Sequence, residues 1–440
     1  MIENPGSNTI ELVVNRELCT GCGTCDALCP KNAIKLSIDE TKGIYIPRIN
    51  KDICNNCGFC YDICPGNKVD YEKLNHEIFE KEPENILIGN YQDCYTAYSK
   101  DTKIRYNSSS GGLITQLLIY ALENGIINGA LVTRMNKSKP LEPEPFIART
   151  KEEIIEASKS KYCPVPVNIA LKEILKSEKN EKFAVVGLPC HINGIRKAEN
   201  KNKKLKDKIV LHLGIFCNHM PTFVGTELYL KKLKIKEDEI IRLDYRGEGW
   251  PGLMKIITSK HTHTNKLSDY WGFIGSHFFY PKRCLMCGDG VCELADISFG
   301  DAWLPKFKDD STGRSIIVSK SKIGENVLRK MSKESHIELN NVSSIEVIQS
   351  QTLMIYLKKK NFTVKKSLLK VYPYSKLLRS DFIDNSIALW FYFNVSLSSN
   401  PYFKIIIQYM PLKIIKVYCA IFNKFASKKA RKDIKSQYDF

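Results

Sequence analysis

The sequence contains no run of about 18 uninterrupted apolar residues, the length that a membrane-spanning helix needs. Its N-terminus, Met1-Ile2-Glu3-Asn4-Pro5, lacks the basic flank and the apolar core of an export signal. We therefore expect no transmembrane segment and a location in the reducing cytoplasm. The sequence also has no GxGxxG motif after a predicted strand, so no Rossmann dinucleotide site is predicted.

Acidic residues are too few to balance the basic ones. The chain has 48 Asp and Glu against 66 Lys and Arg, a net charge of +18. Residues 346–440 hold 17 Lys and Arg against 5 Asp and Glu, so +12 of this charge lies in the last part of the chain. With 440 residues, 43% of them hydrophobic, the chain is long enough for two or three globular domains.

Cysteine, in contrast, is plentiful, and eight of the 16 cysteines form two copies of the pattern C-x2-C-x2-C-x3-C-P. Three closely spaced thiolates can hold three corners of a 4Fe-4S cluster, and in two-cluster ferredoxins the fourth comes from the other run. Zinc and disulfides are the alternatives, but zinc sites usually pair CxxC units across a longer gap. Gly21, Gly23 and Gly58 fit tight bends that point amides at sulfur. The spacing predicts one cluster on Cys19, Cys22, Cys25 and Cys64 and a second on Cys54, Cys57, Cys60 and Cys29.

Four of the other cysteines are candidates for a third 4Fe-4S cluster. Cys190 and Cys217 each follow the end of a predicted strand, at the edge where parallel sheets bind ligands. Cys284 and Cys287 form a CxxC. Buried free thiols and a lone zinc ion are the alternatives, and Cys292 could replace one of the more distant ligands.

A turn rich in serine and glycine opens a predicted helix at residues 113–123. It consists of Ser108, Ser109, Ser110, Gly111 and Gly112. Free amides and the positive end of the helix dipole suit a phosphate, as in FAD, although serine is also an ordinary N-cap.

Charged residues of the same region are candidates for cofactor contacts. Lys161, Arg246 and Lys282 would stabilise flavin phosphates or an anionic substrate, with an ordinary surface position as the alternative for each. Asp301 would orient a ribityl hydroxyl or cap a turn. No general acid or base is assigned.

The domain organisation follows from these signals. Residues 8–75 are predicted to form a small bacterial-type two-cluster ferredoxin domain. Residues 88–341 alternate strands with helices, which predicts a larger α/β flavin-binding domain with a largely parallel sheet, while its part at 242–303 is predicted to form Gly-rich and aromatic loops. Residues 342–440 are predicted to be a basic, mostly helical C-terminal extension. The fold class is therefore α+β.

Within this extension, residues 412–425 predict an amphipathic helix with a basic face. Such a helix can lie on the anionic inner face of a membrane, with 388–395 and 403–407 adding apolar area. It can equally cap the catalytic region with its lysines in water. Nucleic-acid binding is not expected, because the aromatic residues share the apolar stripe. That stripe comprises Ile414, Val417, Tyr418, Ile421, Phe422 and Phe425.

Five ordered motifs between about Cys94 and Asn341 carry a resemblance to a known family. The chain resembles the beta subunits of the coenzyme F(420)-reducing hydrogenases and dehydrogenases, which handle a deazaflavin. The resemblance implies FAD, a 4Fe-4S cluster on Cys190, Cys217, Cys284 and Cys287, and electron exchange with a deazaflavin or another organic substrate. The motifs are Ser110-Gly111-Gly112, Ser160-Lys161-Tyr162, Gly187-Leu188-Pro189-Cys190-His191, Gly214-Ile215-Phe216-Cys217, and Cys284-Leu285-Met286-Cys287 with Ala295 to Trp303.

These observations predict an iron-sulfur flavoprotein oxidoreductase. Clusters carry single electrons and a hydride carries two, so FAD would connect a deazaflavin of the F(420) type to the clusters. A ferredoxin or a partner redox subunit would exchange electrons at the N-terminal domain. One alternative is a ferredoxin-linked reductase of another organic substrate, such as a tetrapyrrole or a polysaccharide or lipid precursor. Another is an electron-transfer subunit without a substrate site.

Overall fold

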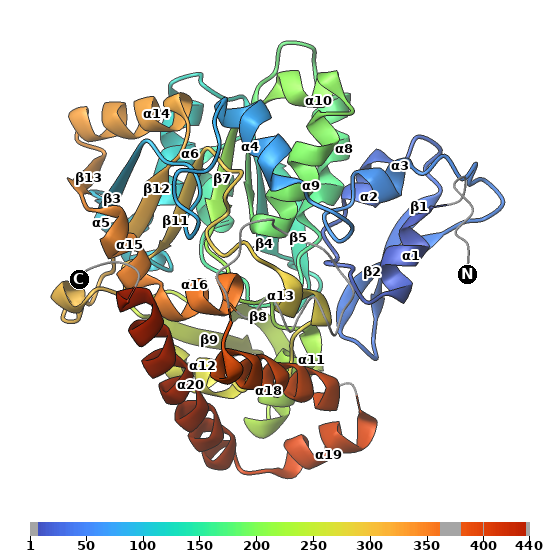
Figure 1. Cartoon of the computed structure of the whole chain (residues 1–440), viewed down its shortest axis with the longest axis vertical. Coiled ribbons are helices and arrows are strands. Elements are labelled where there is room, and N and C mark those ends of the chain that lie inside the picture. The colour runs from blue at the N-terminus through green and yellow to red at the C-terminus, as the bar shows by residue number, and fades with distance from the viewer. Residues whose placement is uncertain (1–7, 361–379, 399, 437–440) are drawn as a thin grey trace.

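The computed structural model describes residues 8–360, 380–398 and 400–436, and its centre is a mixed sheet of eight strands (Figure 1). The strand order is β13-β3-β12-β11-β7-β6-β4-β5. The strands are β3 (Asp93–Ser99), β4 (Gly129–Met135), β5 (Pro143–Ala148), β6 (Phe183–Gly187), β7 (Ile209–Ile215), β11 (Ile297–Asp301), β12 (Ser315–Ser319) and β13 (Ile337–Asn341).

The sheet is parallel only in its four central strands, β4, β6, β7 and β11. Strand β5 pairs antiparallel with β4, and β12, β3 and β13 are antiparallel to their neighbours. The prediction of a largely parallel sheet was therefore wrong for the outer strands at both edges of the sheet. The reason is the connections: residues 136–142 join β4 to β5 and residues 302–314 join β11 to β12 without a crossover α-helix, which a parallel pair would need.

Helices cover both faces of the sheet, because neighbouring residues of the central strands point to opposite sides. On β6, Ala184 packs in one hydrophobic core and Val185 in the other. The first core includes residues of α6 (Leu113–Glu123), α7 (Lys151–Glu156) and α14 (Lys322–Lys333). The second includes residues of α8 (Leu171–Lys176), α9 (Pro189–Glu199) and α10 (Lys203–Lys208).

The stretch predicted as loops contains a second, antiparallel sheet of order β10-β9-β8. Its strands are β8 (Ile240–Asp244), β9 (Leu253–Thr258) and β10 (Thr262–Lys266). It lies with α11 (Phe223–Lys232) and α12 (Leu267–Ile274), and the short α13 (Lys282–Met286) follows. The loop prediction was therefore wrong for these strands.

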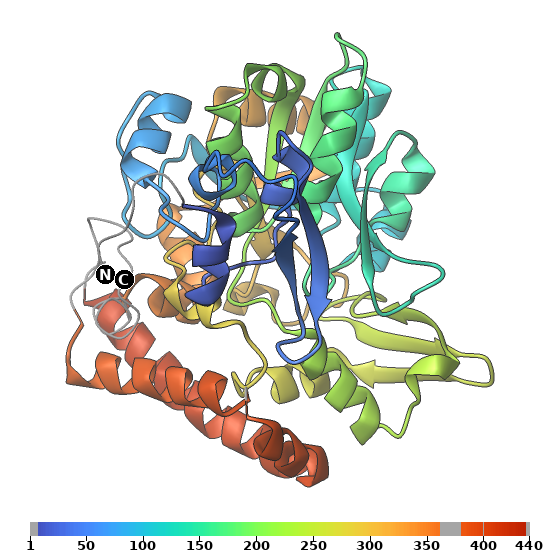
Figure 2. The ribbon, with the colours of Figure 1, turned by 90° about the vertical axis from the view of Figure 1, so that its right-hand side faces the viewer.

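The N-terminal domain packs beside the sheet domain and comes to the front in Figure 2. Gly21, Gly23 and Gly58 have φ angles of 68°, 89° and 72°, so the prediction of tight bends at these glycines is confirmed. The predicted boundary at residue 75 falls inside α4. The elements are α1 (Ile10–Asn15), α2 (Thr24–Leu28), β1 (Ile34–Asp39), β2 (Ile44–Ile49), α3 (Phe59–Asp62) and α4 (Tyr71–Phe79).

The described part of the C-terminal extension is helical and packs along one side of the molecule (Figure 1). Parts of the predicted extension, at 361–379, 399 and 437–440, lie outside the described residues. The helices are α15 (Ser344–Ser350), α16 (Thr352–Lys359), α18 (Phe382–Ser398), α19 (Pro401–Tyr409) and α20 (Leu412–Lys435). Among the described helices none is by itself both long and apolar enough to cross a membrane; α19 and α20 meet that requirement only together, and they are bent by 107°.

Helix α20 packs on the protein, but not through the stripe that the sequence suggested. Its buried residues include Cys419, Ala426 and Ala430, whose small side chains allow a close approach to the helices beneath. Of the predicted stripe, Phe422 stacks on Trp390 with ring centroids 3.3 Å apart. The other five side chains of the stripe are 36–68% exposed, so the helix covers the protein through residues other than most of this stripe.

Candidate redox centres and flavin site

The first predicted cluster group brings the last cysteine of one run to the first three of the other. Burial and the neighbouring thiols of Cys22 and Cys64 raise the pKa of Cys25 well above its ordinary value. Burial and Cys22 also raise the pKa of Cys64 to about 11. The amide of Gly21 donates to Cys19 Sγ at 3.4 Å, as amides do around cluster thiolates. This arrangement is the one that a cluster shared between the two runs requires.

The second group lies nearer the surface. Burial raises the pKa of the Cys60 thiol, and the thiols of Cys29 and Cys57 add to this effect. The amide of Ala33 donates to Cys29 Sγ at 3.3 Å. Cys57 is exposed and Cys54 is half-buried. The geometry suits the second predicted cluster, and its ligation by these cysteines stays a prediction.

The four remaining candidate ligands meet at the carboxyl edge of the central sheet. Cys190 lies in the first turn of α9 directly after β6, Cys217 follows β7, and Cys284 and Cys287 lie in and just after α13. Burial raises the pKa of Cys190 well above its ordinary value, and the largest electrostatic contributions come from Cys217, Cys22, Cys287 and Cys284.

The spacing of the sulfur atoms bears on the choice between zinc and a cluster. Among the described residues, no three cysteine sulfurs lie within 4.8 Å of one another. A tetrahedral zinc ion with bonds of about 2.3 Å would bring its sulfurs to roughly 3.8 Å. The described cysteine sulfurs are therefore not arranged as closely as a tetrahedral zinc ion requires.

Asn168 connects the segments that carry the first and the third cysteine groups, where the two domains are in contact. The amide of Asn168 donates to the carbonyl oxygen of Cys22 at 2.9 Å. The Asn168 side chain donates to Thr24 Oγ1 at 2.8 Å and to the carbonyl oxygen of His191 at 3.0 Å. Asn168 thus ties the loop of the first group to the start of α9, which carries Cys190.

Cys292, the alternative ligand, lies beside the third group. It is fully buried, and its Sγ would be 2.6 Å from a Cβ built at Gly214. Burial raises its pKa well above the ordinary value, and the thiols of Cys190 and Cys217 contribute. Cys292 lies near two of the four candidate ligands, so it remains an alternative ligand of the third cluster. Replacing it by serine tests this alternative.

Lys358 of α16 is a buried cation beside the third group that the sequence analysis did not single out. Its ammonium group donates to the carbonyl oxygen of Cys284 at 3.2 Å, and the residue is 2% exposed. Burial disfavours its charge, but the thiols of Cys287 and Cys217 outweigh burial and raise the pKa of Lys358. A fixed positive charge at this place favours the more negative, reduced form of a cluster.

We expect Lys358→Met to lower the reduction potential of the third cluster by about 100 mV, because a unit charge a few ångströms away contributes about 2–3 kcal/mol. The matched variant is Lys197→Met, since Lys197 donates to the carbonyl oxygen of Cys64 at 2.6 Å in the first group. That change should lower the reduction potential of the first cluster instead. Anaerobic redox titration followed by electron paramagnetic resonance measures both, and equal shifts of both clusters in both variants would contradict the assignment.

The Ser-Gly turn lies directly before α6. A Cβ at Gly111 would lie 2.5 Å from the carbonyl oxygen of Ala97, and Gly112 has a φ of 75°, so both positions favour glycine. No side chain of the described residues caps α6, which leaves its first amides for an anion. The serine hydroxyls bind backbone instead: Ser108 donates to Ile104, Ser110 donates to Arg314, and Ser109 accepts from Ser160.

Arg246 and Asp301, predicted separately, form a pair. The Arg246 guanidinium, 2% exposed, donates to the two carboxylate oxygens of Asp301 at 2.8 and 2.6 Å. The indole of Trp250 donates to the same carboxylate at 2.8 Å. Burial disfavours the Arg246 charge, but Asp301 outweighs it and raises the pKa of Arg246. Both residues thus hold the site together, and Arg246 is not a free cation.

Three of the four tryptophans of the chain gather around this pair. The ring of Trp303 lies 4.4 Å from that of Trp250 and 5.8 Å from that of Trp271, between centroids. The Arg246 guanidinium carbon lies 5.2 Å from the Trp271 ring centroid. Trp303 is 38% exposed, so it offers an aromatic face to a planar ligand. Sequence spacing does not reveal this cluster, although one of its members, Trp303, ends the motif that runs from Ala295.

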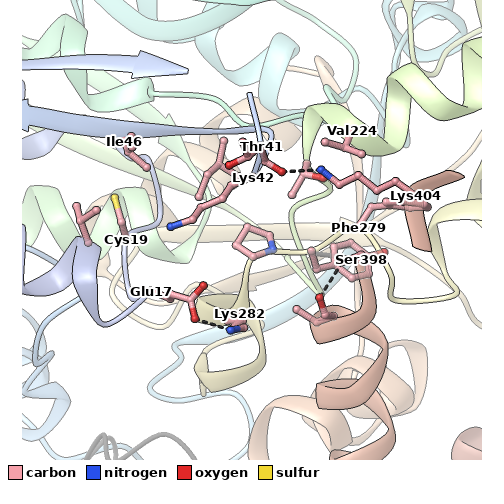
Figure 3. A pocket seen from close by; sticks show the side chains of 16 residues that line it. Glu17, Cys19, Thr41, Lys42, Ile46, Val224, Phe279, Lys282, Ser398 and Lys404 are labelled. Carbon is pink, nitrogen blue, oxygen red and sulfur yellow. Dashed lines mark hydrogen bonds and ion pairs between the residues drawn. The ribbon is translucent and has the colours of Figure 1, made fainter. Parts of the chain in front are cut away.

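The other two predicted cations are engaged elsewhere. The ammonium group of Lys161 donates to three carbonyl oxygens at the end of α7, those of Ala157, Ser158 and Lys159, and burial lowers its pKa to about 7. Lys282 forms an ion pair with Glu17 of the N-terminal domain (Figure 3). Lys161 therefore caps a helix and Lys282 joins two domains in this structure.

Phe216 links the Arg246–Asp301 site to the third cysteine group. It precedes Cys217, and its amide donates to the carbonyl oxygen of Phe299 at 2.8 Å. A Cβ at Gly300 would come within 2.4 Å of the Phe216 ring, so glycine allows this contact. Because β7 and β11 are parallel neighbours, Cys217 and Asp301 follow at the same edge of the sheet.

Family models match most of the chain. The model of the coenzyme F(420) hydrogenase/dehydrogenase beta subunit N-term matches residues 94–172, and that of its C terminus matches residues 180–365. The chain belongs to this beta subunit family. The model of a 4Fe-4S dicluster domain matches residues 18–68, so this member carries an N-terminal ferredoxin-like 4Fe-4S domain.

Individual relatives differ widely from the chain in sequence. The coenzyme F(420) hydrogenase subunit beta of Methanothermobacter thermautotrophicus is 28% identical over 266 residues, which cover 59% of this chain and 88% of that protein. A coenzyme F(420)-dependent sulfite reductase of Methanocaldococcus jannaschii is 26% identical over 354 residues, 77% of this chain and 50% of that protein. A chain of the F(420)-reducing NiFe hydrogenase complex of Methanosarcina barkeri shares the fold, with a TM-score of 0.52, 24% identity, and coverage of 64% of this chain and 94% of that chain.

Proposed function

We propose that the protein is an oxidoreductase that moves electrons between a deazaflavin of the F(420) type and three 4Fe-4S clusters by way of FAD. The observation that carries the proposal is the unbroken order of sites. The Arg246–Asp301 pair leads through Phe216 to Cys217, and Cys190 of the same group borders Cys22 of the first group. Such an order suits stepwise electron transfer.

The residues at the sheet edge fit a flavin nucleotide. The uncapped start of α6, with Gly111 and Gly112 before it, would bind the phosphates, and Trp303 would contact a planar ring. The Arg246–Asp301 pair would keep these segments in place. Bound FAD would supply the conversion between a hydride and single electrons, which the clusters cannot perform.

Electrons would enter or leave at the second cysteine group. Cys57 is exposed there, whereas Cys22, Cys25 and Cys64 of the first group are buried. A ferredoxin or a partner redox subunit would therefore meet the protein at the loop around Cys57. The relationship to a subunit of a hydrogenase supports a partner subunit.

The proposal is tested with full-length protein reconstituted anaerobically with iron, sulfide and FAD. We expect about twelve iron atoms and one FAD per chain, and bleaching of the flavin when reduced F(420) is added. Bound FAD that reduced F(420) cannot bleach would rule out the deazaflavin and point to another organic substrate. About eight iron atoms without FAD would contradict the whole proposal.

A further inference from the structure

The described tail helices present apolar side chains to solvent at one end of the molecule. Helix α19 and the start of α20 lie at the lower margin in Figures 1 and 2. We call the outer face of these two helices the tail surface. It includes Tyr402 (76% exposed), Ile405 (54%) and Tyr409 (78%) on α19, and Ile414 (54%), Ile421 (68%) and Phe425 (53%) on α20. Isolated exposed apolar residues are ordinary, but six of them on two successive helices indicate an interaction site.

Ion pairs on the other side of α20 attach this helix to its neighbours. Asp433 pairs with Lys360, just after α16, at 2.6 Å, and Lys429 pairs with Asp381, just before α18. Farther along, Lys416 pairs with Asp269 of α12 at 2.5 Å. The exposed side chains therefore belong to a helix whose buried face is already occupied, and they cannot turn inward without breaking these pairs.

The helices of the tail surface carry mainly positive charge, although Lys416 and Lys429 are already paired with Asp269 and Asp433. Residues 385–432 contain eight Lys and Arg and no Asp or Glu. Lys413 and Lys424 are exposed on α20 and, at helical spacing, run along one edge of the row formed by Ile414, Ile421 and Phe425. Lys428 and Lys432, also exposed, continue that row toward the end of the helix. An occupant of this surface must accept apolar side chains and supply negative charge beside them.

An anionic bilayer meets both requirements. Apolar side chains of an interfacial helix enter the boundary between headgroups and acyl chains, while flanking lysines contact anionic headgroups. Tyr402 and Tyr409 also suit this boundary, since a tyrosine ring can lie in the apolar layer with its hydroxyl in water. The bend of 107° between α19 and α20 prevents the pair from acting as one straight span, which favours lying on the surface.

We propose that the tail surface docks this protein on an anionic membrane as a peripheral protein. The contact would be made by α19 and the first half of α20, with the exposed lysines of α20 at the headgroups. This proposal is independent of the redox function proposed above, because none of its residues lies in the cysteine groups or the flavin site.

Flotation of the full-length protein with vesicles tests the proposal. One vesicle set contains phosphatidylcholine alone and the other contains phosphatidylcholine with phosphatidylglycerol. We expect flotation with the anionic set, and a loss of binding of at least roughly tenfold in the double variant Ile421→Glu/Phe425→Glu. Ile241→Glu is the matched control, since Ile241 is 58% exposed on β8, and it should float as the wild type does. Unchanged iron content shows that each variant is folded.

A second variant tests the role of charge. Lys424→Ser/Lys428→Ser should weaken binding to the anionic vesicles by roughly fivefold for each lysine. The proposal is overturned if the wild type does not float, or if either double variant binds as the wild type does. A further outcome also overturns it. If neither the wild type nor the variants bind vesicles, and the wild type is a dimer that the Ile421→Glu/Phe425→Glu change separates, a second copy of the chain covers the surface.

Discussion

Replacing Cys190 by serine should remove one 4Fe-4S cluster and leave two, so that iron falls from about twelve to about eight atoms per chain. The reason is that Cys190 belongs to the third group, with Cys217 and the CxxC, and takes no part in the two cysteine runs. Because this group lies between Phe216 and Cys22, the variant should still allow bleaching of bound FAD by reduced F(420), while reduction of the two ferredoxin-domain clusters is lost. Iron analysis and rapid-mixing spectroscopy under anaerobic conditions measure the two effects.

Two further cysteines provide the controls for this experiment. Cys94 is 1% exposed in β3 and lies outside the predicted ligand groups, so Cys94→Ser should retain all the iron. Cys292→Ser separates the alternatives for the third group. Loss of about four iron atoms in Cys292→Ser, with full iron in Cys190→Ser, would show that the ligand set is wrong.

Asp301→Asn should destabilise the central domain by about 3 kcal/mol, because it leaves the buried guanidinium of Arg246 without its counter-charge. The same change should weaken retention of FAD, since the Trp250 indole also loses its carboxylate partner. Urea unfolding followed by tryptophan fluorescence measures the first effect, and gel filtration followed by flavin extraction measures the second.

The matched variant is Asp244→Asn. Asp244 pairs with Lys159 at 2.9 Å, and both side chains are 16% exposed, so this pair is better solvated than Arg246–Asp301. We expect a loss of about 1 kcal/mol and unchanged retention of FAD. If the two variants unfold at the same urea concentration, the Arg246–Asp301 pair does not have the structural role assigned to it.

The sequence predicted those parts of the site whose residues are close together in the chain. Spacing within eleven residues identifies each cysteine run, and the positions of Cys190 and Cys217 after strands explain why they meet. Lys358 could not be found in this way, because it stands among three consecutive lysines and only the tertiary fold brings it to Cys284. The tryptophan cluster likewise joins two loops and helix α12, which sequence spacing does not relate.

Two predictions from the sequence, the loops around β10 and the buried stripe of α20, were wrong for the same kind of physical reason. The residues of strand β10 are alternately exposed and half-buried, and all of them are polar. His263 lies in this strand and His261 just before it. A strand without apolar residues has the composition of a loop, so the sequence pattern did not identify it. Helix α20 buries Ile415 and Ile434 together with small residues, and leaves Ile421 and Phe425 exposed. Hydrophobic patterning identifies an apolar face, but it does not reveal whether that face meets the protein's own core or something outside the molecule.

Gly194 of α9 gives the contact between the domains a further meaning. A Cβ at this position would lie 2.5 Å from Thr24 Oγ1, so a larger side chain would disturb the contact between the ferredoxin domain and the helix whose first turn carries Cys190. Electron tunnelling weakens steeply as donor and acceptor separate. In the proposed electron path, the absent side chain of Gly194 therefore keeps the first and third cysteine groups close enough for tunnelling between them.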